Sequence, residues 1–219
     1  RTRNGPAGSR RMSGTLDTVP HRGHRPAQES CAARRGRAFK RDPMTEEPRS
    51  AEELLDIVDE HDRVVGRAPR GEATSRRLRH RCTSVQVRDP LGRIFVHRRT
   101  PQKLVFPSMH DVVVGGVVGA GETYDEGALR EAEEELGVPG LPAPEPRLTF
   151  LYESPQHTWF LRVYELVCDQ PVRPQPEEID WWDFLPEDEL ERRLRLPDWP
   201  VVPDGLECHR RLRAWHGRS

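Results

Sequence analysis

The segment 121–138, GETYDEGALREAEEELGV, constrains the fold more than any other stretch because signals for the start and end of a helix bound it. Thr123 and Glu126 have the spacing of a capping box, in which each residue satisfies a backbone N–H at the helix start. Gly137 suits the left-handed position after the last turn. We therefore predict a helix over 123–136 that packs on a sheet through an apolar stripe of Ala128, Leu129, Ala132 and Leu136.

Three glutamates crowd one side of this helix. Glu131, Glu134 and Glu135 are related by three and four positions, so their side chains lie together and repel each other. A divalent cation would turn this repulsion into attraction, and oxygen ligands in a half-open cluster suit Mg²⁺ or Mn²⁺. The alternative is a solvated acidic face that Arg130 neutralises. Glu133 is expected to point away from the cluster into solvent.

The residues before the helix favour the metal site. The segment fits the pattern G-x5-E-x7-R-E-U-x-E-E-x-G-U, in which U is a bulky aliphatic residue, except that position 132 holds a smaller alanine. This pattern resembles the Nudix box, the signature of the Nudix hydrolase superfamily. The resemblance implies the α/β fold class, as an α/β/α sandwich with a mixed sheet. The matching positions are Gly116, Glu122, Arg130, Glu131, Ala132, Glu134, Glu135, Gly137 and Val138.

The resemblance also implies roles for particular residues. Glu131, Glu134 and Glu135 would bind one or more Mg²⁺ or Mn²⁺ ions, and the glycines at 115 and 116 would let a backbone carbonyl, assigned to Gly115, approach the metal. The metal would bridge the oxygens of a small-molecule diphosphate and lower the pKa of a bound water. Arg130 would orient the carboxylates by charge-assisted hydrogen bonds, to Glu122 or Glu134.

The general base is left open at this point. Glu134 is the first choice because it lies in the cluster. Glu177, Glu178 and Asp180 in a late acidic loop are alternatives, because some Nudix enzymes take the base from outside the box. The geometry of the site has to decide between them.

Much of 54–138 resembles the isopentenyl-diphosphate-isomerase-like branch of this superfamily. Arg99 and Lys103 match basic residues that contact diphosphate in the isomerase, although strand-end surface charges are an equal alternative. The positions of the isomerase's catalytic cysteine and metal-binding histidine hold Gly115 and Val117 here. We therefore expect a diphosphate hydrolase rather than an isomerase. A catalytically silent domain that senses a nucleotide or binds a partner is the alternative.

The rest of the chain reads as strands around this helix. We predict a hairpin, a second strand pair, a buried strand interrupted by two glycines, a third strand pair and a late strand before two helices. His80, His157 and Trp159 are weaker candidates for the site, and packing roles are favoured for them. The predicted strands are 54–60 with 63–68, 82–89 with 93–99, 111–118, 147–154 with 158–168, and 179–185, and the helices begin near 186 and 203.

Composition divides the chain into a basic head and an acidic body. Residues 1–49 are predicted to be a disordered extension, with Met44 as a candidate native start, and 50–216 to be the hydrolase domain. A nucleic-acid-binding arm is the alternative for the head, but nucleic acid is not the expected partner. No secretory signal or membrane-length apolar run is visible, so we expect a cytoplasmic protein without a membrane partner. One of Trp181 and Trp182 faces outward and leaves a homodimer as an option.

Overall fold

A computed structural model describes residues 51–103 and 105–218 of the chain. The predicted basic extension over 1–49, including the candidate start at Met44, lies outside the described residues and stays a prediction. Among the residues described, no helix is both long enough and apolar enough to cross a membrane.

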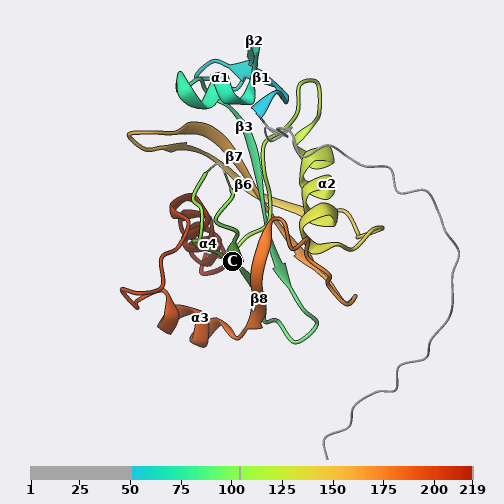
Figure 1. Cartoon of the computed structure of the whole chain (residues 1–219). Coiled ribbons are helices and arrows are strands. Elements are labelled where there is room, and N and C mark those ends of the chain that lie inside the picture. Colours follow the sequence, from blue (N-terminus) through green and yellow to red (C-terminus); the bar gives the residue numbers. More distant parts are fainter. Residues whose placement is uncertain (1–50, 104, 219) are drawn as a thin grey trace, which may run out of the picture. The chain divides into compact units, whose positions relative to one another are not determined.

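A six-stranded mixed sheet forms the centre of the described residues (Figure 1). The strand order is β5-β4-β3-β7-β6, with β8 paired to β4. β3 and β7 run parallel in register from the pair His80 and Trp159 to the pair Arg88 and Val167, and the other pairings are antiparallel. The strands are β3 His80–Arg88, β4 Ile94–Arg99, β5 His110–Asp111, β6 Glu145–Glu153, β7 Thr158–Val167 and β8 Ile179–Leu185.

Helices cover both faces of this sheet. α2, Tyr124–Leu136, lies on one side of β3 and β7, and α4, Pro203–His216, lies on the other (Figure 1). Each face has its own buried apolar cluster: Ala128, Ala132 and Leu136 of α2 belong to one, and Leu212 of α4 to the other. The short helix α3, Glu187–Arg193, joins β8 to the α4 side through Leu190. The predicted α/β/α sandwich is confirmed.

A separate hairpin and a short helix sit at the end of the sheet where β3 begins. β1, Leu54–Val58, pairs with β2, Val64–Pro69, as predicted, and α1, Arg70–Ser75, follows directly. Figure 1 shows these three elements together above the start of β3. This arrangement brings the first residue of α1 towards the glycines that precede α2.

The structure confirms one predicted strand pair and shortens another predicted strand. β3 and β4 are antiparallel neighbours, as predicted, but they share a single register pair, Arg88 with Ile94, because β3 pairs along its length with β7 and β4 pairs with β8. The segment 111–118 is buried, but it joins β3 only through isolated bridges, at Val114 and Val117. The glycines between these bridges break the regular ladder.

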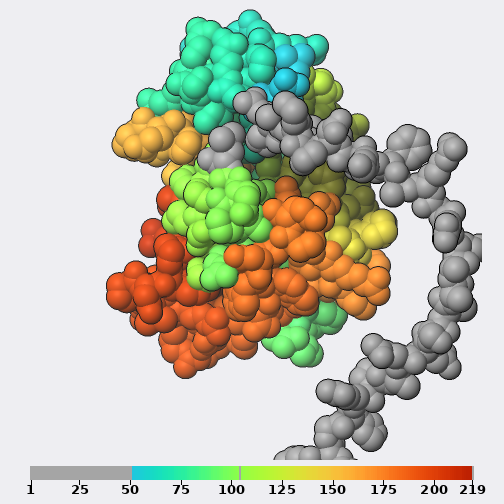
Figure 2. All heavy atoms as spheres, viewed as in Figure 1, coloured from blue at the N-terminus to red at the C-terminus, as the bar shows by residue number. Residues whose placement is uncertain are grey.

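The loop between β4 and β5 lies at the surface, where Figure 2 shows it in green between the teal region of α1 and the orange region of β8. It is tied to the residues before β8, because the N–H of Thr100 donates to the carbonyl of Glu178 at 3.0 Å and its hydroxyl donates to the carbonyl of Glu177 at 2.9 Å. These bonds hold the loop between β4 and β5 beside the predicted acidic loop.

Candidate functional site

Helix α2 has the caps that its sequence predicts. The Thr123 hydroxyl accepts the N–H of Glu126, and the Glu126 carboxylate accepts the N–H of Thr123 at 2.9 Å. Gly137 ends the helix in the left-handed conformation at φ 64°. With both ends fixed in this way, the positions of the glutamates on the helix are defined by the helix geometry.

The three clustered glutamates have very different environments. The Glu134 side chain is 55% exposed, that of Glu131 only 15%, and Glu135 as a residue is 3% exposed. Burial raises the pKa of Glu135 to about 8, and it also raises the pKa of Glu131. Two of the three carboxylates are therefore held where ionisation is costly unless positive charge comes near.

Arg130 brings a positive charge into contact with Glu131 and Glu134. It donates from Nε to Glu122 Oε1 at 2.8 Å and from Nη1 to Glu131 Oε1 at 2.8 Å, and its Nη1 lies 3.4 Å from Glu134 Oε2. A further bond from Nη2 to the Val117 carbonyl at 3.2 Å ties the helix to the turn before it. The predicted bonds to Glu122 and Glu134 are both present, so Arg130 sets the orientation of the carboxylates.

Two glycines allow the chain to pass under the glutamates. A Cβ at Gly115 would lie 2.2 Å from the Thr83 carbonyl, and one at Gly116 would lie 2.6 Å from the Glu131 carboxyl carbon. The Gly116 carbonyl accepts the Thr83 N–H at 2.8 Å, while the Gly115 N–H donates to Glu135 Oε2 at 3.4 Å. Any larger residue at either position would displace β3 or the cluster.

Basic side chains face the glutamates across a polar pocket of about 330 Å³, which we call the glutamate pocket. Arg99 and Lys103 line it as predicted for diphosphate contacts, and Lys103 Nζ lies 3.0 Å from Glu178 Oε1. Arg70 also lines it, although sequence reasoning missed this residue because nothing in 69–80 separates it from three other arginines. The lining residues are Glu53, Arg70, Arg99, Lys103, Gly115, Gly116, Arg130, Glu131, Glu134, Glu135 and Glu178.

The alternatives for the general base are now separated by position. Glu134 and Glu178 both line the glutamate pocket, whereas Glu177 and Asp180 do not. The Asp180 carboxylate is bound by Arg98, from Nε at 2.7 Å and from Nη2 at 3.1 Å. A carboxylate held by this bidentate pair outside the pocket is poorly placed to take a proton from a reacting water.

The residues fit a hard divalent ion in donor type. The side chains offer carboxylate oxygens, which Mg²⁺ and Mn²⁺ prefer as ligands. In the described part of the chain, the buried Glu135 carboxylate accepts one long hydrogen bond, from the N–H of Gly115. Among the described residues, no three His, Cys, Asp or Glu side chains already stand in an arrangement that would hold a metal ion.

Glu133 differs from its neighbours and corrects a prediction. It was expected to be solvated, but its Oε1 accepts the N–H of Gly140 at 2.6 Å and that of Leu141 at 3.1 Å. Its carboxylate thus closes the loop that follows α2. The side chain does not line the glutamate pocket.

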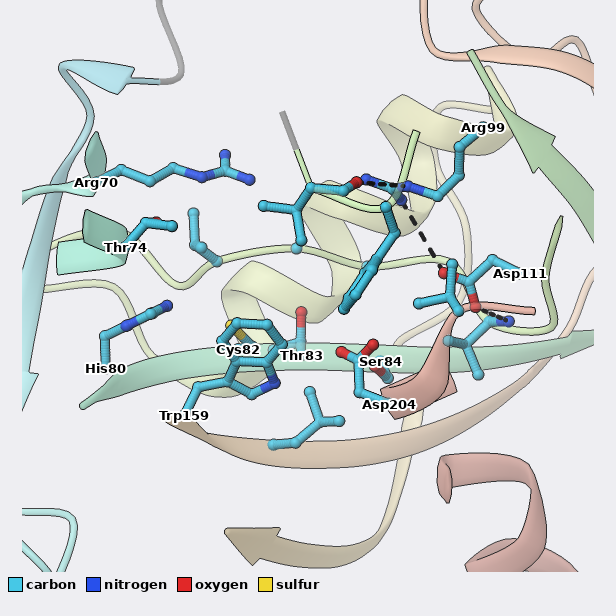
Figure 3. A pocket seen from close by; sticks show the side chains of 18 residues that line it. Arg70, Thr74, His80, Cys82, Thr83, Ser84, Arg99, Asp111, Trp159 and Asp204 are labelled. Carbon is cyan, nitrogen blue, oxygen red and sulfur yellow. Dashed lines mark hydrogen bonds and ion pairs between the residues drawn. The ribbon is translucent and has the colours of Figure 1, made fainter. Parts of the chain in front are cut away.

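A second cavity, of about 90 Å³, opens on the other side of the glycines (Figure 3). We call it the aspartate cavity, because Asp111 and Asp204 line it. The weaker candidates His80 and Trp159 also line it, while Trp159 stacks on Tyr152 with ring centroids 5.4 Å apart. His80 is buried, and its Nδ1 donates to the Leu78 carbonyl at 2.8 Å, in keeping with the predicted packing role.

Comparison with known families gives one match over most of the sheet and its helices. A family model for the NUDIX domain matches residues 78–205. The chain is 61% identical over 171 residues to an uncharacterized Nudix hydrolase of Streptomyces coelicolor, covering 78% of this chain and 93% of the relative. It is 35% identical over 167 residues to the uncharacterized Nudix hydrolase YfcD of Escherichia coli K12, covering 76% and 88%.

Solved structures agree with this match. The crystal structure of DR0079 from Deinococcus radiodurans is 33% identical, with a TM-score of 0.60 over 72% of this chain and 98% of that one. The MutT protein from Methanosarcina mazei is 19% identical, with a TM-score of 0.51 over 62% and 94%, and this likeness concerns the fold alone.

Proposed function

Because this chain belongs to the Nudix hydrolase family, whose members act on pyrophosphate bonds, we propose that it is a metal-dependent hydrolase of a nucleoside diphosphate derivative or a related diphosphate compound. One observation supports this most directly. Arg70, Arg99 and Lys103 face the glutamates of α2 across a single pocket. Phosphate oxygens need such cations, and the glutamates need positive charge of their own.

The residues divide the work by their positions. Arg70, Arg99 and Lys103 bind the diphosphate oxygens, and Arg130 holds the carboxylates of Glu122 and Glu131 in place. Glu131, Glu134 and Glu135, with the backbone carbonyl of Gly115, would hold Mg²⁺ or Mn²⁺. A bound ion of this kind supplies charge neutralisation at the diphosphate and lowers the pKa of a coordinated water. Gly116 also helps to position the cluster, because its missing Cβ leaves room for the Glu131 carboxylate.

Proton removal from the attacking water falls to Glu134 or Glu178. Glu134 is the half-exposed member of the cluster, so its carboxylate can meet solvent and substrate. Glu178 pairs with Lys103 at 3.0 Å on the opposite wall. We favour Glu134 as the base, because among the described residues its nearest cation is Arg130, at 3.4 Å, whereas Glu178 has Lys103 at 3.0 Å.

Two other functions are weighed against this one. An isomerase would need a reactive thiol near the glycine turn, but the Cys82 thiol is buried and burial raises its pKa. A catalytically silent domain has no need for buried carboxylates opposite three cations. Both alternatives are separated from hydrolysis by product analysis: an isomerase releases no phosphate, and a silent domain releases none from any compound.

The test is a panel of diphosphate compounds with Mg²⁺ or Mn²⁺, following phosphate or nucleoside monophosphate. Glu134→Gln is expected to lower kcat at least tenfold, an added barrier of about 1.4 kcal/mol. Glu133→Gln is the matched control, because it removes the same charge from the neighbouring position while its amide oxygen still accepts the N–H groups of Gly140 and Leu141. Unchanged turnover in Glu134→Gln would remove this residue from the mechanism and direct attention to Glu178.

A further inference from the structure

The aspartate cavity and the glutamate pocket share a wall. Arg70, Arg99, Gly115 and Gly116 line both. Figure 3 shows Arg70 and Arg99 reaching in from opposite sides, with Thr83, Trp159 and Asp204 below them. A compound whose diphosphate lies between the arginines and the glutamates therefore has its other end beside this cavity. The inference below rests on the function proposed above.

Two buried carboxyl groups line the cavity. Asp111, at the end of β5, accepts the N–H of Val112 at 2.8 Å and that of Val113 at 3.3 Å, and its Oδ2 lies 4.0 Å from Arg99 Nη1. Asp204 is in the first turn of α4. α4 approaches so closely that a Cβ at Gly205 would lie 2.1 Å from Asp111 Oδ1. The two carboxyls are thus fixed in one small space by the packing of α4.

Three polar atoms in the cavity wall have no hydrogen-bond partner among the residues that the structure describes. They are Thr83 Oγ1 from β3, Trp159 Nε1 from β7 and Asp204 Oδ1 from α4. Trp159 Nε1 is directed towards Asp204 and helps to lower the pKa of that carboxyl, but it does not reach hydrogen-bond geometry. Leaving such a group unsatisfied costs about 1–3 kcal/mol each, so native proteins rarely keep three together without a ligand or water.

The chemistry of these atoms selects a ligand. The indole N–H of Trp159 donates only, the Asp204 carboxylate accepts, and the Thr83 hydroxyl does both. Burial raises the pKa of Asp111 to about 7 and that of Asp204 to about 6, so an N–H donor bound near neutral pH favours their ionised forms. A hydrocarbon group would leave all three atoms unsatisfied. The volume of about 90 Å³ equals that of about three waters, which suits a compact group.

We propose that the aspartate cavity binds the non-phosphate end of the substrate, and that this end is a compact nitrogen-bearing group. Its N–H donors bind Asp204 and Asp111, and an acceptor on the same group binds the indole N–H of Trp159. The substrate class is thereby narrowed to diphosphate esters that end in an amide, or in a single nitrogen-containing ring with both an N–H donor and an acceptor, because an ammonium group has no acceptor for the indole. Esters of plain hydrocarbon alcohols are excluded from productive binding.

The experiment compares two matched probes with Mg²⁺ present: 4-amino-4-oxobutyl diphosphate, which ends in an amide, and 4-methylpentyl diphosphate, which ends in a hydrocarbon group of the same shape. Wild-type kcat/KM is expected to be at least tenfold higher for the amide compound. Asp204→Asn should reduce this preference below about threefold, whereas Glu207→Gln, which neutralises an acid of the same helix outside the cavity, should keep it. Trp159→Phe, which removes the N–H and keeps a ring, is the second variant if Asp204→Asn does not fold.

Binding measured separately from turnover distinguishes the two proposals. Calorimetry with the corresponding methylene-diphosphonates, which cannot be hydrolysed, should show tighter binding of the amide compound. That result without turnover of any diphosphate would uphold the cavity assignment and overturn the proposed hydrolysis. Turnover of both probes at equal kcat/KM, unchanged in Asp204→Asn and Trp159→Phe, would overturn the cavity assignment and leave hydrolysis standing.

Discussion

The glutamate pocket and the aspartate cavity both bury acids, yet they compensate them in different ways. In the pocket, five carboxylates of the wall face four cations, Arg70, Arg99, Lys103 and Arg130. The five carboxylates are those of Glu53, Glu131, Glu134, Glu135 and Glu178. In the cavity, Asp111 Oδ2 lies 4.0 Å from Arg99 Nη1. The cavity wall also carries three polar atoms without a hydrogen-bond partner among the described residues, and one of them is Asp204 Oδ1. The pocket is thus suited to ionic charge, and the cavity to hydrogen-bonding groups.

The difference teaches how burial acts on a carboxyl. Burial is the largest cause of the raised pKa of both Glu135 and Asp111, to about 8 and about 7. What differs is the remedy that the surroundings allow: a divalent ion shared by several glutamates of one helix, or a proton or N–H donor for an isolated aspartate. Residue type alone does not indicate which remedy applies.

Removing divalent ions should affect the glutamate pocket most, and it is the largest effect we expect. In excess EDTA, kcat should fall at least about a thousandfold, an added barrier of about 4 kcal/mol, because the clustered carboxylates then repel the diphosphate. Adding Mg²⁺ or Mn²⁺ back should restore turnover, and circular dichroism should show the fold unchanged throughout. Full turnover in EDTA would mean that the two regions do not differ as described.

The aspartate cavity should instead be visible in the pH dependence of stability. Burial in the folded state raises the pKa of Asp111 from 3.8 to about 7. The positive charge of Arg99 opposes this rise, and the negative charge of Asp204 adds to it. The contribution of Asp111 is fully present below pH 3.8 and is lost as pH rises through about 7. Between pH 5 and pH 8, this carboxyl alone should lower the free energy of unfolding by about 2–3 kcal/mol.

Asp111→Asn tests this prediction, because the amide oxygen can still accept the N–H of Val112 but cannot ionise. Urea unfolding at pH 5 and pH 8, in EDTA, should show a smaller difference in the variant than in the wild type. An identical pH dependence in both proteins would show that Asp111 ionises in the folded state as freely as in water.

Neighbouring arginines on β4 give the smallest effect and test the wall that the two regions share. Arg99→Gln should lower kcat/KM about thirtyfold, about 2 kcal/mol, because Arg99 lines both spaces and a charged hydrogen bond contributes on this scale. Arg98→Gln is the matched control, because Arg98 binds Asp180 outside both spaces. Equal losses of kcat/KM in the two variants would show that Arg99 acts only through the general charge of the surface.

Local features of the chain were predictable, and long-range ones were not. The caps of α2 at Thr123 and Gly137 and the hairpin of β1 and β2 depend on residues close in sequence, and both are confirmed. The parallel pairing of β3 with β7 was not predicted, because β7 follows far later in the chain. A parallel pair needs a long crossover, and no local pattern announces it.

The site shows the same division. The three glutamates share one helix and a known pattern, so sequence indicated them together. Arg70, Asp111 and Asp204 come from α1, β5 and α4, and none stands in a recognisable motif. A buried acid in the first turn of α4 leaves no trace in sequence other than an aspartate after Pro203, which is common at any helix start.

The split between elements has a consequence for how such an enzyme diversifies. The unpartnered atoms of Thr83, Trp159 and Asp204 belong to β3, β7 and α4, whereas the glutamates belong to α2. A library randomised at Trp159 and Asp204 would therefore explore new leaving groups while the bond-breaking apparatus stays untouched. Substitutions on one side of the sheet would then change which compound the enzyme accepts.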